Sequence, residues 1–152
     1  MNYSRLTDQL LIGTTPGTVD YGRLREMGVR LVINMRFLVS VGPPKSVSDV
    51  EYLHLRTFDS PLLPIPVSAL MRGTREALRV SAEGGSVYIH CSRGRHRSVA
   101  MAAAILIAQG QSPEAAMALI KKQRPEADPG APYIRSQILK FANSWKRGEA
   151  AT

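Results

Sequence analysis

The stretch that decides the fold is VYIHCSRGRHRSVAMAAAILIAQG, residues 87–110. Its first part, together with Ser86, is a short apolar and β-branched run, which predicts a buried strand ending at His90. Residues 98–109 are apolar nearly all round, which predicts a helix in the middle of a globular domain. Between the two lies a loop rich in Arg and Gly, so the only cysteine of the chain, Cys91, stands at the carboxyl end of a buried strand.

The loop at residues 91–96 and the start of the following helix have the features of an anion-binding site. Backbone N–H groups of a tight loop can point inward together, and the amino end of a helix adds partial positive charge. Gly94 allows a loop conformation that a side chain would obstruct. Arg97 can bind two phosphate oxygens through parallel hydrogen bonds. The loop therefore predicts a phosphate site that needs no metal.

The surroundings of Cys91 favour a nucleophile. A field that binds phosphate also lowers the pKa of a thiol at the base of the loop, because the thiolate is itself an anion. The alternatives are a buried inert cysteine and a rare ligand, but a strongly basic loop is a poor apolar site. A single cysteine cannot complete a thiolate zinc site, and His54, His90 and His96 lack the spacing of a shared ligand set. We therefore predict no metal and no other cofactor.

The whole chain has the pattern of one α/β domain. Its 152 residues, 44% of them hydrophobic, are enough for one core. Apolar periodicity and turn residues predict strands at 8–13, 29–34, 50–56 and 86–90, and helices at 20–27, 67–82, 98–109, from 113 and around 134–145. Strands alternate with helices early and helices dominate later, so we predict a small, mainly parallel central sheet flanked by helices. The predicted domain covers residues 1–147, and a disordered tail follows at 148–152.

The net charge of +8 favours an anionic partner. Arg outnumbers Lys, and guanidinium groups suit fork-like recognition of phosphate, although a generally basic surface is the alternative. Aromatic residues make up only 6% of the chain and are absent from the basic loop, so we do not predict a nucleic-acid partner. No apolar stretch approaches the roughly 20 residues that span a bilayer, and no secretory signal precedes the domain. We therefore predict a cytoplasmic protein without a membrane span.

The residues HCSRGRHRS, 90–98, match the His-Cys-x5-Arg-Ser/Thr signature of the protein tyrosine phosphatase superfamily. The chain is most similar to the dual-specificity branch, because residues 6–36 resemble that family's first strand, helix and strand, and residues 128–141 resemble its last helix. The resemblance covers most of residues 6–142. It implies a dual-specificity phosphatase-like fold and a cysteine-dependent phosphatase.

The resemblance also implies the roles of individual residues. Cys91 attacks phosphorus and forms a phosphocysteine, while Arg97 binds the phosphoryl oxygens and the transition state. Ser98 donates to the cysteine sulfur and helps it leave in the second step, and His90 orders the cysteine through hydrogen bonds. The phosphate-binding set is the loop with its arginine: Ser92, Arg93, Gly94, Arg95, His96 and Arg97.

The reaction also needs a proton donor for the leaving oxygen. The family places an aspartate on a mobile loop about thirty residues before the cysteine. Asp59 lies 32 positions before Cys91, after a predicted strand and before a proline-rich turn, so it is the predicted general acid. Asp49 is the competing candidate, but it precedes a strand and is expected at the wrong end of the sheet. Alternatively, Asp59 has only a structural role and initiates the turn before Ser-Pro.

The loop departs from the common family pattern, because Arg93, Arg95 and His96 stand where small or neutral residues are frequent. Such a basic loop resembles those of relatives that act on phosphoinositides or inositol pyrophosphates. Alternatively, Arg93 and Arg95 project outward and form salt bridges. We predict a tyrosine or dual-specificity protein phosphatase, with a phosphoinositide or inositol phosphate phosphatase as the alternative. A phosphate-binding module without turnover is a further alternative; a rhodanese-like sulfur transferase would not explain Asp59.

Overall fold

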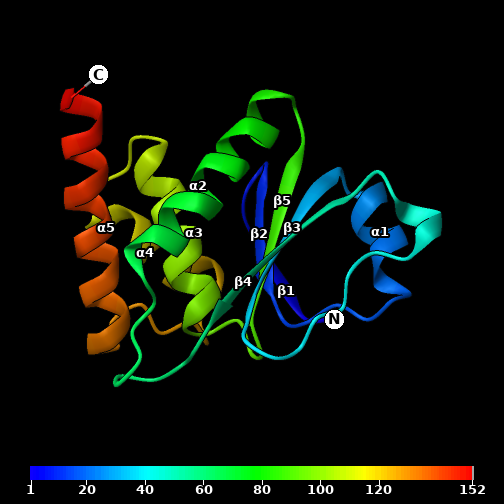
Figure 1. The fold of residues 1–152 in the computed structure, drawn as a ribbon, viewed down its shortest axis with the longest axis horizontal. Helices are drawn as coiled ribbons and strands as arrows, with labels where there is room; N and C mark the ends of the chain where they lie inside the picture. Colours follow the sequence, from blue (N-terminus) through cyan, green and yellow to red (C-terminus); the bar gives the residue numbers. More distant parts are fainter. Residues whose placement is uncertain (152) are drawn as a thin grey trace.

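The computed structural model describes residues 1–151 and contains one five-stranded sheet with helices on both faces (Figure 1). The strands are β1 (Tyr3–Thr7), β2 (Leu10–Gly13), β3 (Val29–Arg36), β4 (Glu51–Thr57) and β5 (Ser86–His90). The helices are α1 (Asp20–Glu26), the short 3-10 helix η1 (Lys45–Val47), α2 (Val67–Ala82), α3 (Arg97–Ala108), α4 (Pro113–Gln123) and α5 (Pro132–Ala151). The α/β class predicted from the order of elements is confirmed.

The sheet has the strand order β1-β2-β5-β3-β4. Neighbouring strands from β2 to β4 pair in parallel, and only β1 is antiparallel to its neighbour. The prediction of a small, mainly parallel sheet is therefore confirmed. Because the four parallel strands point the same way, the loops that follow β2, β3, β4 and β5 all lie at one edge of the sheet. We call this edge the carboxyl edge.

The amino end of the chain differs from the prediction. A single strand was expected at residues 8–13, but the structure forms a hairpin in which β1 pairs with β2. Strand β1 lies at the edge of the sheet, and Leu6 is its only buried residue. An edge strand with one buried side chain lacks the alternation by which a strand is recognised, so the sequence did not reveal it.

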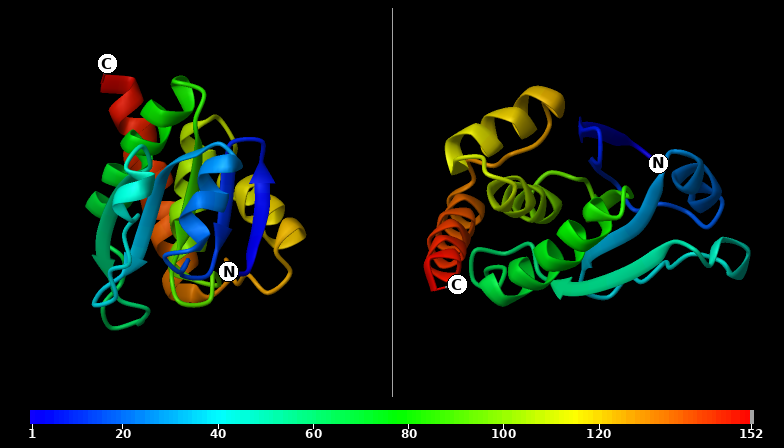
Figure 2. Two further views of the ribbon diagram at one scale, coloured as in Figure 1. Left: turned by 90° about the vertical axis from the view of Figure 1, so that its right-hand side faces the viewer. Right: turned by 90° about the horizontal axis from the view of Figure 1, so that it is seen from above.

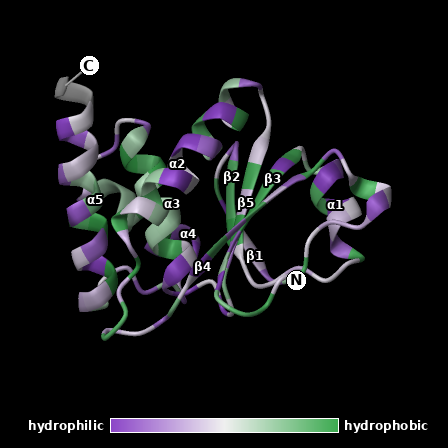
Figure 3. Cartoon of the chain, in the orientation of Figure 1, coloured by the Kyte–Doolittle hydropathy of each residue, from purple (hydrophilic) through white to green (hydrophobic). Residues whose placement is uncertain are grey.

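The helices divide into two layers around the sheet. Helices α2 to α5 cover one face, and α1 with η1 covers the other (Figures 1 and 2). A hydrophobic core lies on each face of the sheet, and strand β5 contributes to both. Val87 and Ile89 belong to the core around α3, while Tyr88 belongs to the core beneath α1. Helix α3 is buried over ten of its twelve residues and is apolar around its circumference (Figure 3). The loop between β5 and α3 is thus anchored at both ends in the core.

The helix boundaries follow local signals in the sequence. Helix α1 ends before Gly28, whose φ of 90° is the left-handed conformation that glycine tolerates. Helix α4 begins after Ser112, whose Oγ accepts a hydrogen bond from the Ala115 N–H at 3.1 Å. Helix α5 is described as far as Ala151, but side chains from 149 onward and residue 152 lie outside the described residues, so the tail predicted at 148–152 stays a prediction. Within the described part of the chain, no helix is long and apolar enough to cross a bilayer.

Candidate active site

The loop at residues 91–96, here called the cysteine loop, wraps around the Cys91 sulfur. The Gly94 N–H donates to Sγ at 3.2 Å, and the Ser98 hydroxyl lies 3.3 Å from the same atom. The side chain of Cys91 is buried, with 3% of its surface exposed. Gly94 has a φ of 66°, and a Cβ at this position would stand 3.0 Å from the Gly13 carbonyl oxygen and closer still to the Arg124 guanidinium. The tight turn around the sulfur therefore requires glycine.

These contacts make the thiol acidic. Burial alone would raise the pKa of Cys91, but hydrogen bonds from the Ser98 side chain and backbone and from the Gly94 backbone, together with the charge of Arg97, outweigh it. The pKa is therefore lowered from its ordinary value. A thiolate stabilised in this way is the reactive form of a cysteine nucleophile.

Arg97 begins α3 and is held by the ends of two strands. Its Nη1 donates to the Thr57 carbonyl at 2.9 Å and to the Met35 carbonyl at 3.4 Å. Its Nε is buried and has no hydrogen-bond partner among the described residues. The guanidinium is thus fixed by one nitrogen and retains a donor for an anion in the pocket that it lines with Cys91.

The cysteine loop, the first residue of α3 and one residue of a neighbouring loop enclose a pocket at the carboxyl edge. Its lining consists of Asp59, Cys91, Ser92, Arg93, Arg95, His96 and Arg97. The Arg95 Nε donates to the Glu126 carbonyl at 3.1 Å, and the Arg93 side chain has no hydrogen bond or ion pair within the described part of the chain. Neither arginine forms a salt bridge with a described carboxylate, so both remain available to an anion in the pocket.

Asp59 stands over this pocket from the loop between β4 and α2. Its Oδ2 lies 3.0 Å from His96 Nδ1, and its Oδ1 accepts a hydrogen bond from the Tyr133 hydroxyl at 2.5 Å. Burial alone would raise the pKa of Asp59, but these two hydrogen bonds and the charges of His96 and Arg97 lower it. Asp49 instead precedes β4 and lies 3.6 Å from Arg25, at the opposite edge of the sheet. The spacing argument thus selected the aspartate that lies at the pocket.

The three histidines of the chain differ in burial and in hydrogen-bond partners. The His90 ring is fully buried, neither ring nitrogen has a hydrogen-bond partner of normal geometry among the described residues, and burial lowers its pKa to about 3. Its ordering role through hydrogen bonds stays a prediction. His54 Nε2 lies 2.6 Å from the Arg36 carbonyl oxygen, and His96 Nε2 lies 3.4 Å from Asp128. No group of three or more metal-ligating side chains occurs among the described residues.

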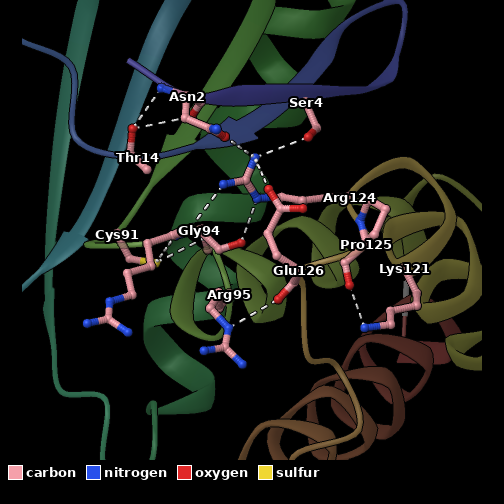
Figure 4. A network of polar contacts seen from close by, with 12 residues as sticks. Asn2, Ser4, Thr14, Cys91, Gly94, Arg95, Lys121, Arg124, Pro125 and Glu126 are labelled. Carbon is pink, nitrogen blue, oxygen red and sulfur yellow. Dashed lines mark hydrogen bonds and ion pairs between the residues drawn. The ribbon is translucent and has the colours of Figure 1, made fainter.

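Arg124, which the sequence did not single out, supports the cysteine loop from behind (Figure 4). Its side chain is 1% exposed, its Nε donates to the Gly94 carbonyl at 2.9 Å, and its Nη2 donates to the Arg93 carbonyl at 3.0 Å. Its Nη1 reaches Asn2 Oδ1 at 3.0 Å and Ser4 Oγ at 3.1 Å. Arg124 therefore ties the cysteine loop to the first strand. It follows α4 directly, and only the fold brings it to the loop.

Replacing Arg124 with methionine is expected to damage both stability and catalysis. The change leaves the Gly94 and Arg93 carbonyls without their donor, so the free energy of unfolding should fall by about 3 kcal/mol. A loosened cysteine loop should also raise the thiol pKa of Cys91 and lower kcat/KM by about tenfold or more. Urea unfolding and the pH dependence of thiol alkylation measure these effects.

The matched control is Arg75→Met, which removes an exposed arginine on α2 and should change stability by no more than about 0.5 kcal/mol. If Arg124→Met kept the wild-type thiol pKa and stability, Arg124 would not position the loop.

A thiolate, an arginine and a carboxylate around one anion pocket define the class of this site, a cysteine-dependent phosphatase. No family model matches the chain. The mouse protein "Phosphatidylglycerophosphatase and protein-tyrosine phosphatase 1" is 37% identical over 130 residues, which are 80% of this chain and 67% of the relative. Human "Dual specificity phosphatase 28" is 28% identical over 143 residues, 90% of this chain and 76% of the relative.

Solved structures agree with these relatives. The crystal structure of PTPMT1 matches with a TM-score of 0.87 and 31% identity over 99% of this chain and 100% of that chain. A second structure, PTPMT1 in complex with PI(5)P, matches with a TM-score of 0.85 at the same identity over 97% and 98% of the two chains. The chain therefore belongs to the dual-specificity phosphatase-like branch of the cysteine-dependent protein tyrosine phosphatase superfamily.

Proposed function

We propose that the protein hydrolyses phosphate monoesters in two steps through a phosphocysteine. In the first step the Cys91 thiolate attacks phosphorus, the S–P bond forms, and the P–O bond to the leaving group breaks. The protonated Asp59 carboxyl gives its proton to the leaving oxygen. In the second step Asp59 accepts a proton from water as the water attacks phosphorus, and the sulfur leaves as a thiolate. Ser98 and Gly94 support this step because they already contact Sγ.

The proposal assigns binding of the phosphoryl group to the cysteine loop and Arg97. The amino end of α3 faces the pocket, and anions are favoured at such an end. The buried, unpartnered Nε of Arg97 supports its role as a donor to a phosphoryl oxygen. Because Arg97 also contacts the ends of β3 and β4, its position is set before substrate arrives, which favours stabilisation of the charge of the transition state.

The substrate that the pocket favours is a phosphorylated lipid headgroup. The observation that carries this proposal is the pair Arg93 and Arg95, which line the pocket beside Cys91 without a carboxylate partner among the described residues. Two further cations suit a substrate with several anionic groups, such as a phospholipid headgroup or an inositol phosphate. The name of the mouse relative and the PI(5)P complex of PTPMT1 support this class.

A phosphotyrosyl protein is the second candidate, since the same relative is also named a protein-tyrosine phosphatase. A phenyl ring gains most from apolar or aromatic walls, but every side chain that lines the pocket is polar, charged or the cysteine itself. The absence of a nucleic-acid partner and the cytoplasmic location stay predictions.

Phosphate release from a soluble phosphoinositide headgroup and from a phosphotyrosyl peptide tests the substrate class. The double variant Arg93→Gln/Arg95→Gln should lose about tenfold or more in kcat/KM on the headgroup, because two charge-assisted contacts disappear, and much less on the peptide. Arg75→Gln removes a charge outside the pocket and serves as the control. Equal losses on both substrates would show that the arginines do not select the substrate. No release from either substrate would contradict the proposed function.

A further inference from the structure

The large hydrophobic side chains that are exposed are not spread evenly over the described residues. They are Val19, Leu38, Phe58, Leu62 and Leu63. Val19 belongs to the loop after β2, Leu38 to the loop after β3, and the other three to the loop after β4. All therefore lie in the loops of the carboxyl edge, where the cysteine loop follows β5. We call these five residues the apolar rim.

Hydrogen bonds hold the turn that carries Leu62 and Leu63. Leu62 is 89% exposed, and its N–H donates to Ser60 Oγ at 3.2 Å, while the Leu63 N–H donates to the Ser60 carbonyl at 3.2 Å. The turn is anchored by Ile65, which is buried and whose carbonyl accepts from Gln137 Nε2 at 2.7 Å. The loop between β4 and α2 extends beyond the sheet at the bottom of Figure 1. The turn therefore presents Leu62 to solvent in a fixed position three residues after Asp59.

A second part of the rim is also supported by packing. The rings of Phe37 and Phe58 stack with centroids 4.2 Å apart, which joins the loop after β3 to the loop after β4. Arg56 adds a hydrogen bond from Nη1 to the Phe37 carbonyl at 2.7 Å. Leu38, which follows directly, is 82% exposed. Single exposed leucines are ordinary on protein surfaces, but tips gathered at the edge that holds a catalytic pocket indicate a contact surface.

The charge at this edge selects the kind of partner. Arg93 and Arg95 line the pocket, and Arg56 is exposed beside the Phe37 and Phe58 stack. The carboxylates of Asp59 and Asp128 both face the His96 ring, at 3.0 and 3.4 Å. The exposed carboxylates that pair with arginines of α1 and α2, by contrast, lie at the opposite edge and include Asp49, Glu51 and Glu83. The carboxyl edge thus combines the apolar rim with the cations Arg56, Arg93 and Arg95, although Asp20, Asp59 and Asp128 also lie there.

We propose that the apolar rim inserts into the headgroup region of an anionic lipid bilayer, so that the pocket takes its phosphate directly from the membrane surface. This inference rests on the proposed lipid-phosphate activity. Separate apolar tips on three loops suit a fluid interface, whereas a protein interface has a continuous apolar core within a polar border. Arg56, Arg93 and Arg95 attract anionic lipids and the apolar tips add hydrophobic burial, the two contributions that hold peripheral proteins on membranes.

Vesicle co-sedimentation of the full chain tests the rim. Vesicles of phosphatidylcholine with phosphatidylglycerol should bind the wild type, and pure phosphatidylcholine vesicles should bind it much less. Leu62→Gln/Leu63→Gln should weaken binding to the anionic vesicles by about tenfold or more, because two apolar side chains are no longer buried. Ala82→Gln, an exposed substitution at the far end of α2, is the matched control. Hydrolysis of a soluble aryl phosphate by the double variant should stay at the wild-type rate.

Several outcomes would overturn the proposal. The proposal is wrong if the wild-type protein does not bind anionic vesicles. It is also wrong if the double variant binds them as tightly as the wild type. If vesicle binding is unchanged but hydrolysis of a phosphoprotein slows, the rim docks a protein instead. Loss of aryl phosphate hydrolysis in the double variant would indicate a damaged site, and Leu38→Gln, on another loop, then repeats the vesicle test. Leu38→Gln that binds anionic vesicles as well as the wild type would also contradict the proposal. Vesicle binding by Cys91→Ser separates the two proposals, since it needs no turnover.

Discussion

Replacing Cys91 with serine is expected to abolish phosphate release while leaving phosphate binding intact. The Sγ atom is the proposed nucleophile, and a serine hydroxyl at neutral pH is far less ionised than a thiol whose pKa is lowered by Ser98, Gly94 and Arg97. The loss of turnover should reach about a thousandfold or more, as expected when a nucleophile is removed. The backbone N–H groups of the loop and the Arg97 guanidinium remain, so inorganic phosphate should still bind. Phosphate release and titration calorimetry measure the two effects.

The control is Ser68→Ala, an exposed change on α2 that should alter neither property. Unchanged turnover in Cys91→Ser would remove the phosphocysteine mechanism altogether. Loss of both turnover and phosphate binding would instead show that the sulfur is needed to shape the loop, since Gly94 and Ser98 both contact it.

The centre of the fold was predictable because its signals are local. Residues 86–108 change from a buried strand to a basic loop and then to a wholly apolar helix, and each change is visible in a window of a few residues. The Ser112 cap and the left-handed Gly28 are signals of the same kind. The position of Asp59 was predictable for a different reason. Parallel strands bring the loop after β4 to the edge where the cysteine loop follows β5.

The supports of the site were not predictable because they join distant segments. Arg124 reaches Asn2 across 122 positions, and Tyr133 reaches Asp59 across 74, so neither pair leaves a periodic or motif-like trace. A buried arginine beside a proline looks like an ordinary helix end in the sequence. The sequence places His96 and Asp59 in the same site but does not predict their contact, because that contact depends on how the loop between β4 and α2 folds over the pocket.

Replacing Asp59 with asparagine should slow hydrolysis of alkyl phosphates far more than that of activated aryl phosphates. An alkoxide leaves poorly without a proton, so removal of the acid should cost about 10²- to 10⁴-fold there, while a phenolate with a low pKa leaves unaided. The reaction needs Asp59 protonated and Cys91 ionised. Because Tyr133 and His96 lower the pKa of Asp59, the carboxyl is ionised at neutral pH, and wild-type kcat/KM on alkyl phosphates should rise as the pH falls toward that pKa.

This alkaline limb of the pH profile should vanish in Asp59→Asn, whose amide does not titrate. Tyr133→Phe is the matched control, because it keeps the carboxyl but removes the hydroxyl that donates to it at 2.5 Å. Loss of a hydrogen bond that favours the ionised form raises the pKa of Asp59, so the limb should move to higher pH in this variant. An equal loss on alkyl and aryl phosphates in Asp59→Asn would assign the proton to another group. A limb that stays in place in Tyr133→Phe would mean that Asp59 ionisation does not set it, since the Tyr133 hydroxyl donates directly to this carboxylate.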